Sequence, residues 1–360
     1  MTRCLVALPG ELPTSSASRR SCLATWKSTS VVWSTRQTGS PVGVCWKSST
    51  MANSRGSRVN DLSSEMRAVN GLRLDVAIVS FFSDIGRLSG TLSSLADAFR
   101  HLQTSLPDTQ LTITIVDNTG DHLQRYSVQL KAVLAHVGVH LEIIYSSANL
   151  GYGSANNLAL NDSASDYVIV LNPDVLLAED MLLNAVLYLQ ERPDVALLAP
   201  DASDPETGQA QYLHKRYPGA LTFASRFLGV RAASRDRAFY EMHTERDAGT
   251  PYEPLLVSGC CMILPTSCWR QLGGFAEDFF LYFEDYDLSL RAGMLGRVVA
   301  LPTLRISHYG GGAGRKGLTH IRLFLRSAVK FFNRYGWQLL SSAQPPSRSS
   351  EPASDNSTGR

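Results

Sequence analysis

Between residues 74 and 193 the chain repeats one pattern, a short apolar run followed by a longer stretch of mixed polarity. The apolar runs are rich in Val, Ile and Leu, which is typical of strands buried on both faces of a parallel sheet. In the stretches between them, apolar residues recur every three or four positions, which predicts amphipathic helices. The predicted strands are LDVAIVSFF (74–82), LTITIVDN (111–118), LEIIYS (141–146) and DYVIVLNPD (166–174), and Pro193 ends the last of these helices.

Strands that alternate with helices predict an α/β fold with a mostly parallel central sheet flanked by helices, here a single catalytic domain over residues 71–340. Parallel strands place their carboxyl ends at one edge of the sheet, where ligands of such folds bind. We therefore expect the polar residues that follow the strands to gather at this edge; they are Asp117, Asn118, Asn149, Asn172 and Asp174.

The two ends of the chain lack any such pattern. Residues 1–70 are rich in Ser, Thr and Arg, hold no acid between Glu11 and Asp61, and show no periodicity, which predicts a disordered N-terminal extension. This composition is also that of an organelle transit peptide. We favour another origin, a misplaced start upstream of a true beginning at Met66 or Met51. The tail, residues 341–360, is also predicted to be disordered.

Composition narrows the class of protein further. The 360 residues, 44% hydrophobic and 18% charged, suffice for one large globular domain or two modest ones. A net charge of +2 gives no support for nucleic acid as a partner. Six cysteines without a C-x-x-C pair predict no disulfide framework, and the adjacent Cys260 and Cys261 are expected in the core of a cytoplasmic protein. No apolar run approaches the roughly 18 residues that span a bilayer, so we expect no integral membrane protein.

The stretch NLGYGSANN (149–157) resembles a dinucleotide-binding turn, because Gly151 and Gly153 follow a predicted strand and Asp174 comes later as a candidate ribose ligand. Two strand–helix units precede it, however, and Asn156 occupies the third glycine position. We therefore favour another phosphate-bearing ligand. Glycines let the backbone approach phosphates closely, and the following helix offers free amide donors.

An acidic cluster lies in the stretch GGFAEDFFLYFEDYDLSLR (273–291), where Glu284, Asp285 and Asp287 follow several aromatic residues. Apolar surroundings raise the pKa of a carboxyl group, as catalytic sites require. One or two of these acids could simply cap a helix that begins here. Three together, with Arg291 one turn later, indicate a catalytic base at a helix start.

Two further residues are candidate metal ligands. Asp174 ends the strand in NPD, where a carboxylate at the sheet edge can bind a divalent cation or can merely form a turn. His308 precedes a glycine-rich loop that contains Arg315 and Lys316, cations that could close over phosphates. His308 could equally have a structural role or bind the metal, and both interpretations stay open.

In their order along the chain, these motifs resemble the inverting family-2 glycosyltransferases of the GT-A fold, and most of all the bacterial rhamnosyltransferases. The resemblance covers residues 74–337, and the long aromatic and acidic stretch is its most specific part. The motifs are VDN (116–118), NLGYGSANN (149–157), VLNPD (170–174), SGCCMILP (258–265), GGFAEDFFLYFEDYDL (273–288) and His308.

The resemblance implies a role for each site residue. It implies that Asp117 binds the nucleotide base, that Asp285 is the general base and that Glu284 and Asp287 orient the acceptor or the base. It implies Asp174 and His308 as ligands of a divalent metal, Mg²⁺ or Mn²⁺. The remaining donor-binding residues would be Asn118, Asn149, Gly151, Gly153, Asn157, Asn172 and Arg315.

Two positions depart from the family pattern. Asn172 replaces the first carboxylate of the usual D-x-D, which implies weaker binding of the metal without donor. The first strand ends in VSFFS, where relatives carry Asn after an aromatic residue. The contact made there in the donor pocket is therefore in question.

The activity implied by the resemblance is transfer of L-rhamnose from dTDP-L-rhamnose, with inversion, to a lipid-linked or polysaccharide acceptor. The setting implied is biosynthesis of cell-surface polysaccharide such as lipopolysaccharide O-antigen. Two alternatives stay open, a sugar nucleotidyltransferase and a non-catalytic sugar-nucleotide-binding relative. The segment SFFSDIGRLSG (80–90) lacks the basic signature of the first, and the acidic cluster disfavours the second.

The segment LTHIRLFLRSAVKFFNRYGW (318–337) predicts a basic amphipathic helix. We favour packing on the domain with a solvated basic face. The alternative is peripheral contact with the cytoplasmic face of the inner membrane, because such helices bind anionic membrane surfaces.

Overall fold

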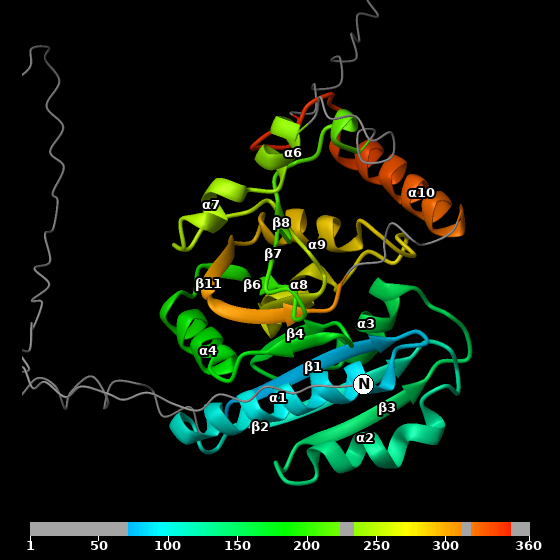
Figure 1. Cartoon of the computed structure of the whole chain (residues 1–360), viewed down its shortest axis with the longest axis vertical. Coiled ribbons are helices and arrows are strands. Elements are labelled where there is room, and N and C mark those ends of the chain that lie inside the picture. Colours follow the sequence, from blue (N-terminus) through cyan, green and yellow to red (C-terminus); the bar gives the residue numbers. More distant parts are fainter. Residues whose placement is uncertain (1–70, 224–233, 311–317, 347–360) are drawn as a thin grey trace, which may run out of the picture. The chain divides into compact units, whose positions relative to one another are not determined.

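A nine-stranded sheet forms the centre of the computed structural model, which describes residues 71–223, 234–310 and 318–346 (Figure 1). These residues belong to the unit Arg67–Arg360, whereas the unit Met1–Met66 lies outside the described residues. The strand order is β3-β2-β1-β4-β10-β6-β11-β5, and β7 pairs with β6. The strands are β1 (Arg73–Ser80), β2 (Gln110–Asp117), β3 (His140–Tyr145), β4 (Tyr167–Leu171), β5 (Val175–Leu177), β6 (Val195–Ser203), β7 (Ala210–Gln211), β10 (Cys261–Pro265) and β11 (Arg297–His308).

The predicted α/β fold with a mostly parallel sheet is confirmed. The four predicted strands coincide with β1 to β4, which pair in parallel, and β6 and β11 also pair in parallel. The sheet is mixed because β10 lies antiparallel between β4 and β6, and β5 and β7 are antiparallel to their neighbours. An apolar run has the same pattern in either direction, so the sequence did not predict this insertion.

Helices cover both faces of the sheet (Figure 1). On one face α1, α2 and α4 bury their apolar residues in the largest core cluster. On the other face α3 contacts β1 and β2, α8 contacts β4 and β10, and α9 contacts β6 and β11, and their apolar residues join a core cluster that contains Trp269. The helices are α1 (Ile85–Ser105), α2 (Ser127–Leu134), α3 (Tyr152–Leu160), α4 (Met181–Glu191), α6 (Ser234–Tyr240), α7 (His243–Asp247), α8 (Thr266–Leu272), α9 (Glu284–Ala292) and α10 (Leu318–Tyr335).

Beside the main sheet, two further pairs of segments are joined by backbone hydrogen bonds. A short sheet pairs β8 (His214–Lys215) with β9 (Leu256–Val257). Nearby, Tyr217 and Ser342 exchange two backbone hydrogen bonds of 3.0 Å. The domain therefore includes the first residues of the predicted tail, whereas residues 1–70 and 347–360 lie outside the described part.

Close packing explains the two glycines of the turn before α3. Gly151 has φ of +82°, and a Cβ added there would lie 2.2 Å from the carbonyl oxygen of Phe280. That carbonyl accepts a hydrogen bond of 3.1 Å from the amide of Tyr152. A Cβ at Gly153 would lie 2.9 Å from the Cβ of Phe275. The glycines thus seat the turn against the aromatic segment that precedes the acidic cluster.

We predict that Gly151→Ala destabilises the domain by roughly 2–4 kcal/mol, because it combines a left-handed φ with a backbone clash. Gly138→Ala is the matched control, since Gly138 also has a left-handed φ of +65° but no atom within 4 Å of an added Cβ. It should cost only about 1 kcal/mol. Urea unfolding of both variants measures the difference, and equal losses of stability would contradict the packing role.

Candidate active site

The carboxyl ends of β1 to β4 lie side by side at one edge of the sheet. In the strand registers Ser80 is opposite Asp117, and Asp117 is opposite Tyr145. Leu171, the last residue of β4, is opposite Ile78 of β1. The residues that follow these strands therefore start from a common edge, as the alternating pattern predicted.

At this edge Asp117 and Asn118 organise the loops around them. Asp117 is fully buried, and its carboxylate accepts hydrogen bonds from the amides of Thr119 (3.1 Å) and Leu123 (2.7 Å). The side-chain amide of Asn118 donates to Gly151 O (3.0 Å) and to Asn149 Oδ1 (3.1 Å), and Asn118 Oδ1 accepts from Leu150 N. Base binding by Asp117 stays a prediction, because its oxygens are engaged in its own loop.

Asn157 joins α3 to the segment that precedes the acidic cluster. The residue is buried, its side-chain nitrogen donates to Phe275 O (2.9 Å), and its oxygen accepts from Phe275 N (2.8 Å). Both functional groups of the amide are therefore used in this clamp. Its predicted contact with a donor has no support from this geometry.

The structure brings the two predicted metal ligands together. His308 Nε2 lies 3.5 Å from Asp174 Oδ1, because the last residues of β11 pair with the start of β5. The other ring nitrogen of His308 lies 3.0 Å from Gln211 Oε1, and Gln211 Nε2 donates to His308 O (2.7 Å). Such a partner orients the imidazole and leaves Nε2 facing the carboxylate. Gln211 was not predicted as a site residue, because it lies in no recognisable sequence motif.

The short connection between β9 and β10 joins the acidic cluster to the strand end that leads to Asp174. The amide of Gly259 donates to Asp285 Oδ2 (3.0 Å), and the next carbonyl, of Cys260, accepts from the amide of Asn172 (2.8 Å). Burial raises the pKa of the Cys260 thiol, and the charges of Asp174 and Asp285 raise it further. The connection thus bonds to Asp285 on one side and to Asn172, two residues before Asp174, on the other.

Tyr152, in the centre of the glycine turn, completes this arrangement. Its hydroxyl donates to Gly259 O (2.6 Å) and lies 3.0 Å from the side-chain oxygen of Asn172. Burial raises its pKa well above the usual value, so the hydroxyl keeps its proton. Tyr152 was not among the predicted site residues, because the glycine motif assigns roles only to the glycines and asparagines around it.

The acids at the start of α9 differ in their surroundings. Asp285 is partly exposed, and burial raises its pKa to about 6 against the opposing effect of hydrogen bonds from Gly259 N and Tyr286 N. Glu284 is buried, and desolvation followed by the charge of Asp285 raises its pKa well above the usual value. Within the described residues Glu284 Oε2 has no hydrogen-bond partner. Burial thus favours the protonated form of Glu284, whereas the carboxylate of Asp285 accepts hydrogen bonds from two backbone amides.

Backbone strain precedes these acids. Tyr282 and Phe283 have φ of +69° and +68°, the left-handed region that bulky residues rarely occupy. Such conformations cost on the order of 1–3 kcal/mol each and persist where surrounding contacts enforce them, often at active sites. Here the enforced geometry turns the chain so that Asp285 faces Gly259.

Asp287 holds the structure together. It is fully buried, and its carboxylate accepts hydrogen bonds of 2.7 Å from Arg291 Nε, Arg334 Nη1 and Tyr335 Oη. Arg291 also donates to the carbonyls of Leu272 and Gly274. Asp287 thus joins α9 to α10. Its predicted role in orienting the acceptor or the base stays a prediction.

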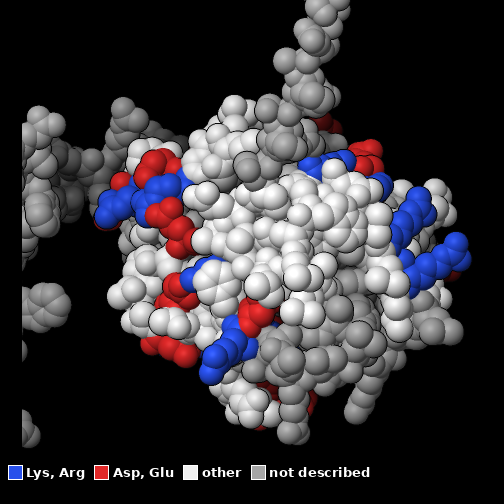
Figure 2. Space-filling model, turned by 90° about the horizontal axis from the view of Figure 1, so that it is seen from above, with Lys and Arg blue, Asp and Glu red and all other residues white. Residues whose placement is uncertain are grey.

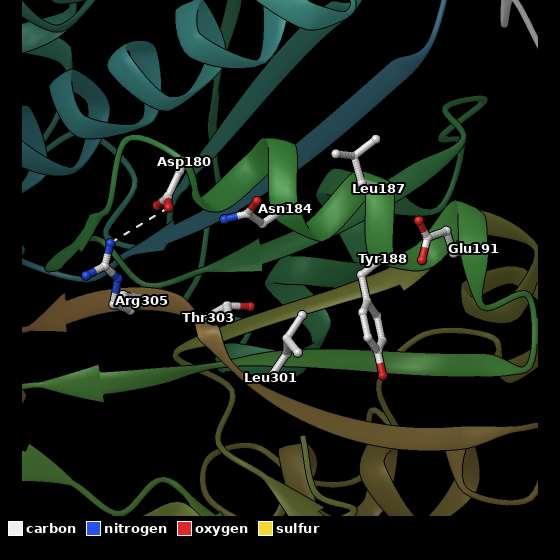
Figure 3. Close-up of a pocket in the computed structure, with 8 residues that line it drawn as sticks. All are labelled: Asp180, Asn184, Leu187, Tyr188, Glu191, Leu301, Thr303 and Arg305. Carbon is white, nitrogen blue, oxygen red and sulfur yellow. Dashed lines mark ion pairs between the residues drawn. The ribbon is translucent and has the colours of Figure 1, made fainter. Parts of the chain in front are cut away.

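Other features lie away from this arrangement. Arg315 and Lys316 fall outside the described residues. In the described part of the chain no group of three or more His, Cys, Asp or Glu side chains could hold a metal ion. A groove of about 550 Å³ lies between α4 and β11, with Asp180 and Arg305 paired across it (Figure 3). None of the predicted site residues lines it.

Comparisons with known proteins place these features in context. The sequence model of the family "Glycosyl transferase family 2" matches residues 76–263. The N-acetylglucosaminyl-diphospho-decaprenol L-rhamnosyltransferase of Mycobacterium tuberculosis (strain CDC 1551 / Oshkosh) is 29% identical over 220 residues, which cover 55% of this chain and 69% of that protein. Rhamnosyltransferase WbbL of Escherichia coli (strain K12) is 24% identical over 222 residues, 58% of this chain and 79% of that protein.

Solved structures are more distant. GalNAc-T7 with UDP, GalNAc and Mn²⁺ gives a TM-score of 0.47 at 12% identity, over 66% of this chain and 43% of that chain. TarS 1-349 of S. aureus gives a TM-score of 0.43 at 15% identity, over 73% of this chain and 66% of that chain. The matched region thus spans less than half of the first structure and about two thirds of the second.

We predict that Asp287→Asn lowers the stability of the domain by about 2–4 kcal/mol, because it leaves two arginines without their buried partner. Asp278→Asn is the matched control, since Asp278 binds the same Arg334 at 2.6 Å but is exposed. It should cost less than about 1 kcal/mol. Thermal unfolding measures both variants, and similar melting temperatures would contradict the structural role of Asp287.

Proposed function

Because the chain belongs to glycosyl transferase family 2, we propose that it transfers a sugar from a nucleotide-sugar donor to an acceptor hydroxyl group. Membership confirms the family that the motifs resembled. We further propose L-rhamnose from dTDP-L-rhamnose as donor and a lipid-linked or polysaccharide acceptor. The names of the mycobacterial and E. coli relatives support this choice. Family membership also favours transfer over the nucleotidyltransferase alternative.

The observation that supports the proposal is the hydrogen bonding of the Gly259–Cys260 connection, which joins Asp285 to Asn172, two residues before Asp174. One carboxylate, Asp174, has the imidazole of His308 beside it, and both groups can bind a divalent metal. The other has its pKa raised to about 6, as a general base requires. Two carboxylates with separate surroundings can perform separate tasks in one reaction.

In the proposed reaction Asp285 accepts the proton of the acceptor hydroxyl. The acceptor oxygen then forms its bond to the anomeric carbon as the bond from that carbon to the nucleoside diphosphate breaks, which inverts the configuration. A base with this placement contributes typically about 10²–10⁴ in rate. Gly259 N orients the carboxylate, and Glu284, which keeps its proton, places no second negative charge beside it.

Asp174 and His308 would hold a divalent cation, Mg²⁺ or Mn²⁺. A carboxylate oxygen and an imidazole nitrogen 3.5 Å apart fit such an ion, and Gln211 fixes the tautomer that leaves Nε2 available. When bound, the ion would stabilise the negative charge of the leaving diphosphate. Asn172 supplies no carboxylate, so we propose that donor oxygens complete the ligand set.

We predict that Asp285→Asn abolishes transfer but preserves donor binding. The amide keeps the shape of the side chain and lacks the basic oxygen that accepts the proton. Transfer is measured with dTDP-L-rhamnose and a lipid-linked acceptor, and binding by thermal stabilisation with and without Mn²⁺ or Mg²⁺. Turnover at the wild-type rate in this variant would remove the base assignment. Absence of stabilisation by any of a panel of nucleotide sugars, for the wild-type protein, would contradict the proposed function.

The raised pKa of Asp285 predicts an acid limb in the pH profile. The carboxyl is protonated below its pKa of about 6, so kcat/KM should fall about tenfold per pH unit below that value and level off above it. Glu284→Gln is the matched variant, because Gln resembles the protonated Glu284. Its acid limb should keep the same midpoint, and a midpoint near 4 in the wild-type enzyme would contradict the assignment.

A further inference from the structure

The outer face of α10 exposes apolar side chains in a row. Ile321, Leu325 and Val329 stand four residues apart, so they lie on one side of the helix. The segment after the helix adds Trp337, Leu339 and Leu340, of which Leu339 is 69% exposed. We call these six residues the outer stripe. Large apolar side chains that gather on a surface, rather than occur singly, mark an interaction site.

The helix that carries the outer stripe is basic, and the acids that contact this part of the chain, Asp236, Asp278 and Asp287, belong to other segments. Residues 318–346 contain four Lys or Arg residues and no Asp or Glu. Arg322 and Arg326 are exposed next to the stripe, and neither forms an ion pair with any described residue. Seen from the side of α6 and α10, a broad area of this face is uncharged, and Lys and Arg side chains stand at the right-hand edge (Figure 2).

The inner face of α10 has its own partners, and of the outer stripe Trp337 also stacks on Phe332, with ring centroids 4.7 Å apart. Phe331 and Phe332 are buried in a cluster with Phe279 and Phe283. Polar contacts add to this packing, since Ser327 Oγ donates to Leu281 O (2.8 Å) and the hydroxyl of Tyr282 lies 3.0 Å from His320 Nδ1. The inner face therefore packs against residues 279–283, which include Tyr282 and Phe283, the two residues with left-handed φ before the acidic cluster.

We propose that the outer stripe and its arginines dock the domain onto the surface of an anionic phospholipid bilayer. The apolar side chains would enter the interface between headgroups and acyl chains, and Arg322 and Arg326 would contact lipid phosphates. Among the described residues no helix is long and apolar enough to cross a bilayer, and this docking lies in the plane of the surface. The absence of acids from the helix matches a negatively charged partner.

Docking also has a consequence that rests on the proposed function. One helix would contact the bilayer with its outer face and the segment before Asp285 with its inner face. A lipid-linked acceptor stays at the membrane surface, so the helix would hold the general base at the height of the acceptor's headgroup. Transfer to a lipid-linked acceptor would then gain from docking, and transfer to a soluble acceptor would not.

The test is flotation of the full chain with vesicles of phosphatidylglycerol and phosphatidylcholine at low salt. The stripe variant is Leu325→Ser with Val329→Ser, and the charge variant is Arg322→Glu with Arg326→Glu. The matched control is Val128→Ser with Lys131→Glu on α2, where Val128 is 81% exposed and Lys131 is exposed. In Figure 1 α2 lies at the opposite end of the domain from α10.

We expect the wild type and the control to float with anionic vesicles. The charge variant should lose binding by about two orders of magnitude, because two surface charges are reversed. The stripe variant should lose binding by a similar factor, because two apolar side chains no longer enter the interface. Neutral vesicles should bind the wild type far less. No flotation of the wild type, or equal flotation of the stripe variant, would overturn docking. Sedimentation velocity tests whether a second copy of the chain binds the stripe instead. If the wild type forms a dimer and does not float, and the stripe variant is a monomer, the stripe is a self-association surface.

Donor turnover and donor binding, measured on the same preparations, separate this proposal from the proposed function. The outer stripe contacts none of the candidate catalytic residues, so the α10 variants should keep thermal stabilisation by nucleotide sugar. Lost flotation by an active enzyme would leave the function in place. Failure of the wild type to bind any donor, with flotation intact, would leave the docking surface in place.

Discussion

The hydrogen bonds of two adjacent residues, Gly259 and Cys260, are the constraint on which the candidate site depends. One amide binds the carboxylate of Asp285, and one carbonyl binds the amide of Asn172, two residues before Asp174. A side chain at position 259 would crowd both Tyr152 and Asp285, since an added Cβ would lie 3.1 Å and 3.3 Å from their nearest atoms. Glycine at this position thus allows the backbone to bind Asp285 and to lie close against Tyr152.

Around that connection, packing contacts and buried ion pairs hold the backbone that carries the acidic cluster. Phe280 and Phe275 receive the turn before α3, while Asp287 and Arg334 tie α9 to α10. These contacts enforce the left-handed pair that precedes Asp285. The fold itself therefore sets the backbone position of Asp285, the proposed base, and Gly259 N binds its carboxylate.

The site illustrates how three neighbouring acids acquire three different characters. Asp287 is matched by two arginines and a tyrosine, Glu284 is buried without such partners, and Asp285 accepts backbone amides at a partly exposed position. Charge partners favour the ionised form of a carboxyl group, and burial favours the protonated form. Position on the first turn of α9 decides which of these surroundings each acid meets, because residues on a helix face different directions.

The sequence by itself determined the order of strands and helices, the common edge of β1 to β4 and the family, since these follow from apolar periodicity and local motifs. It also marked Asp174, His308 and Asp285 as candidates, which the tertiary structure brings close to one another or to Cys260. Only the tertiary structure decided the antiparallel insertion of β10, the clamp made by Asn157 and the buried ion pairs of Asp287. These depend on contacts between residues far apart in the chain, and a local pattern of polarity carries no information about which distant segment will pack against it.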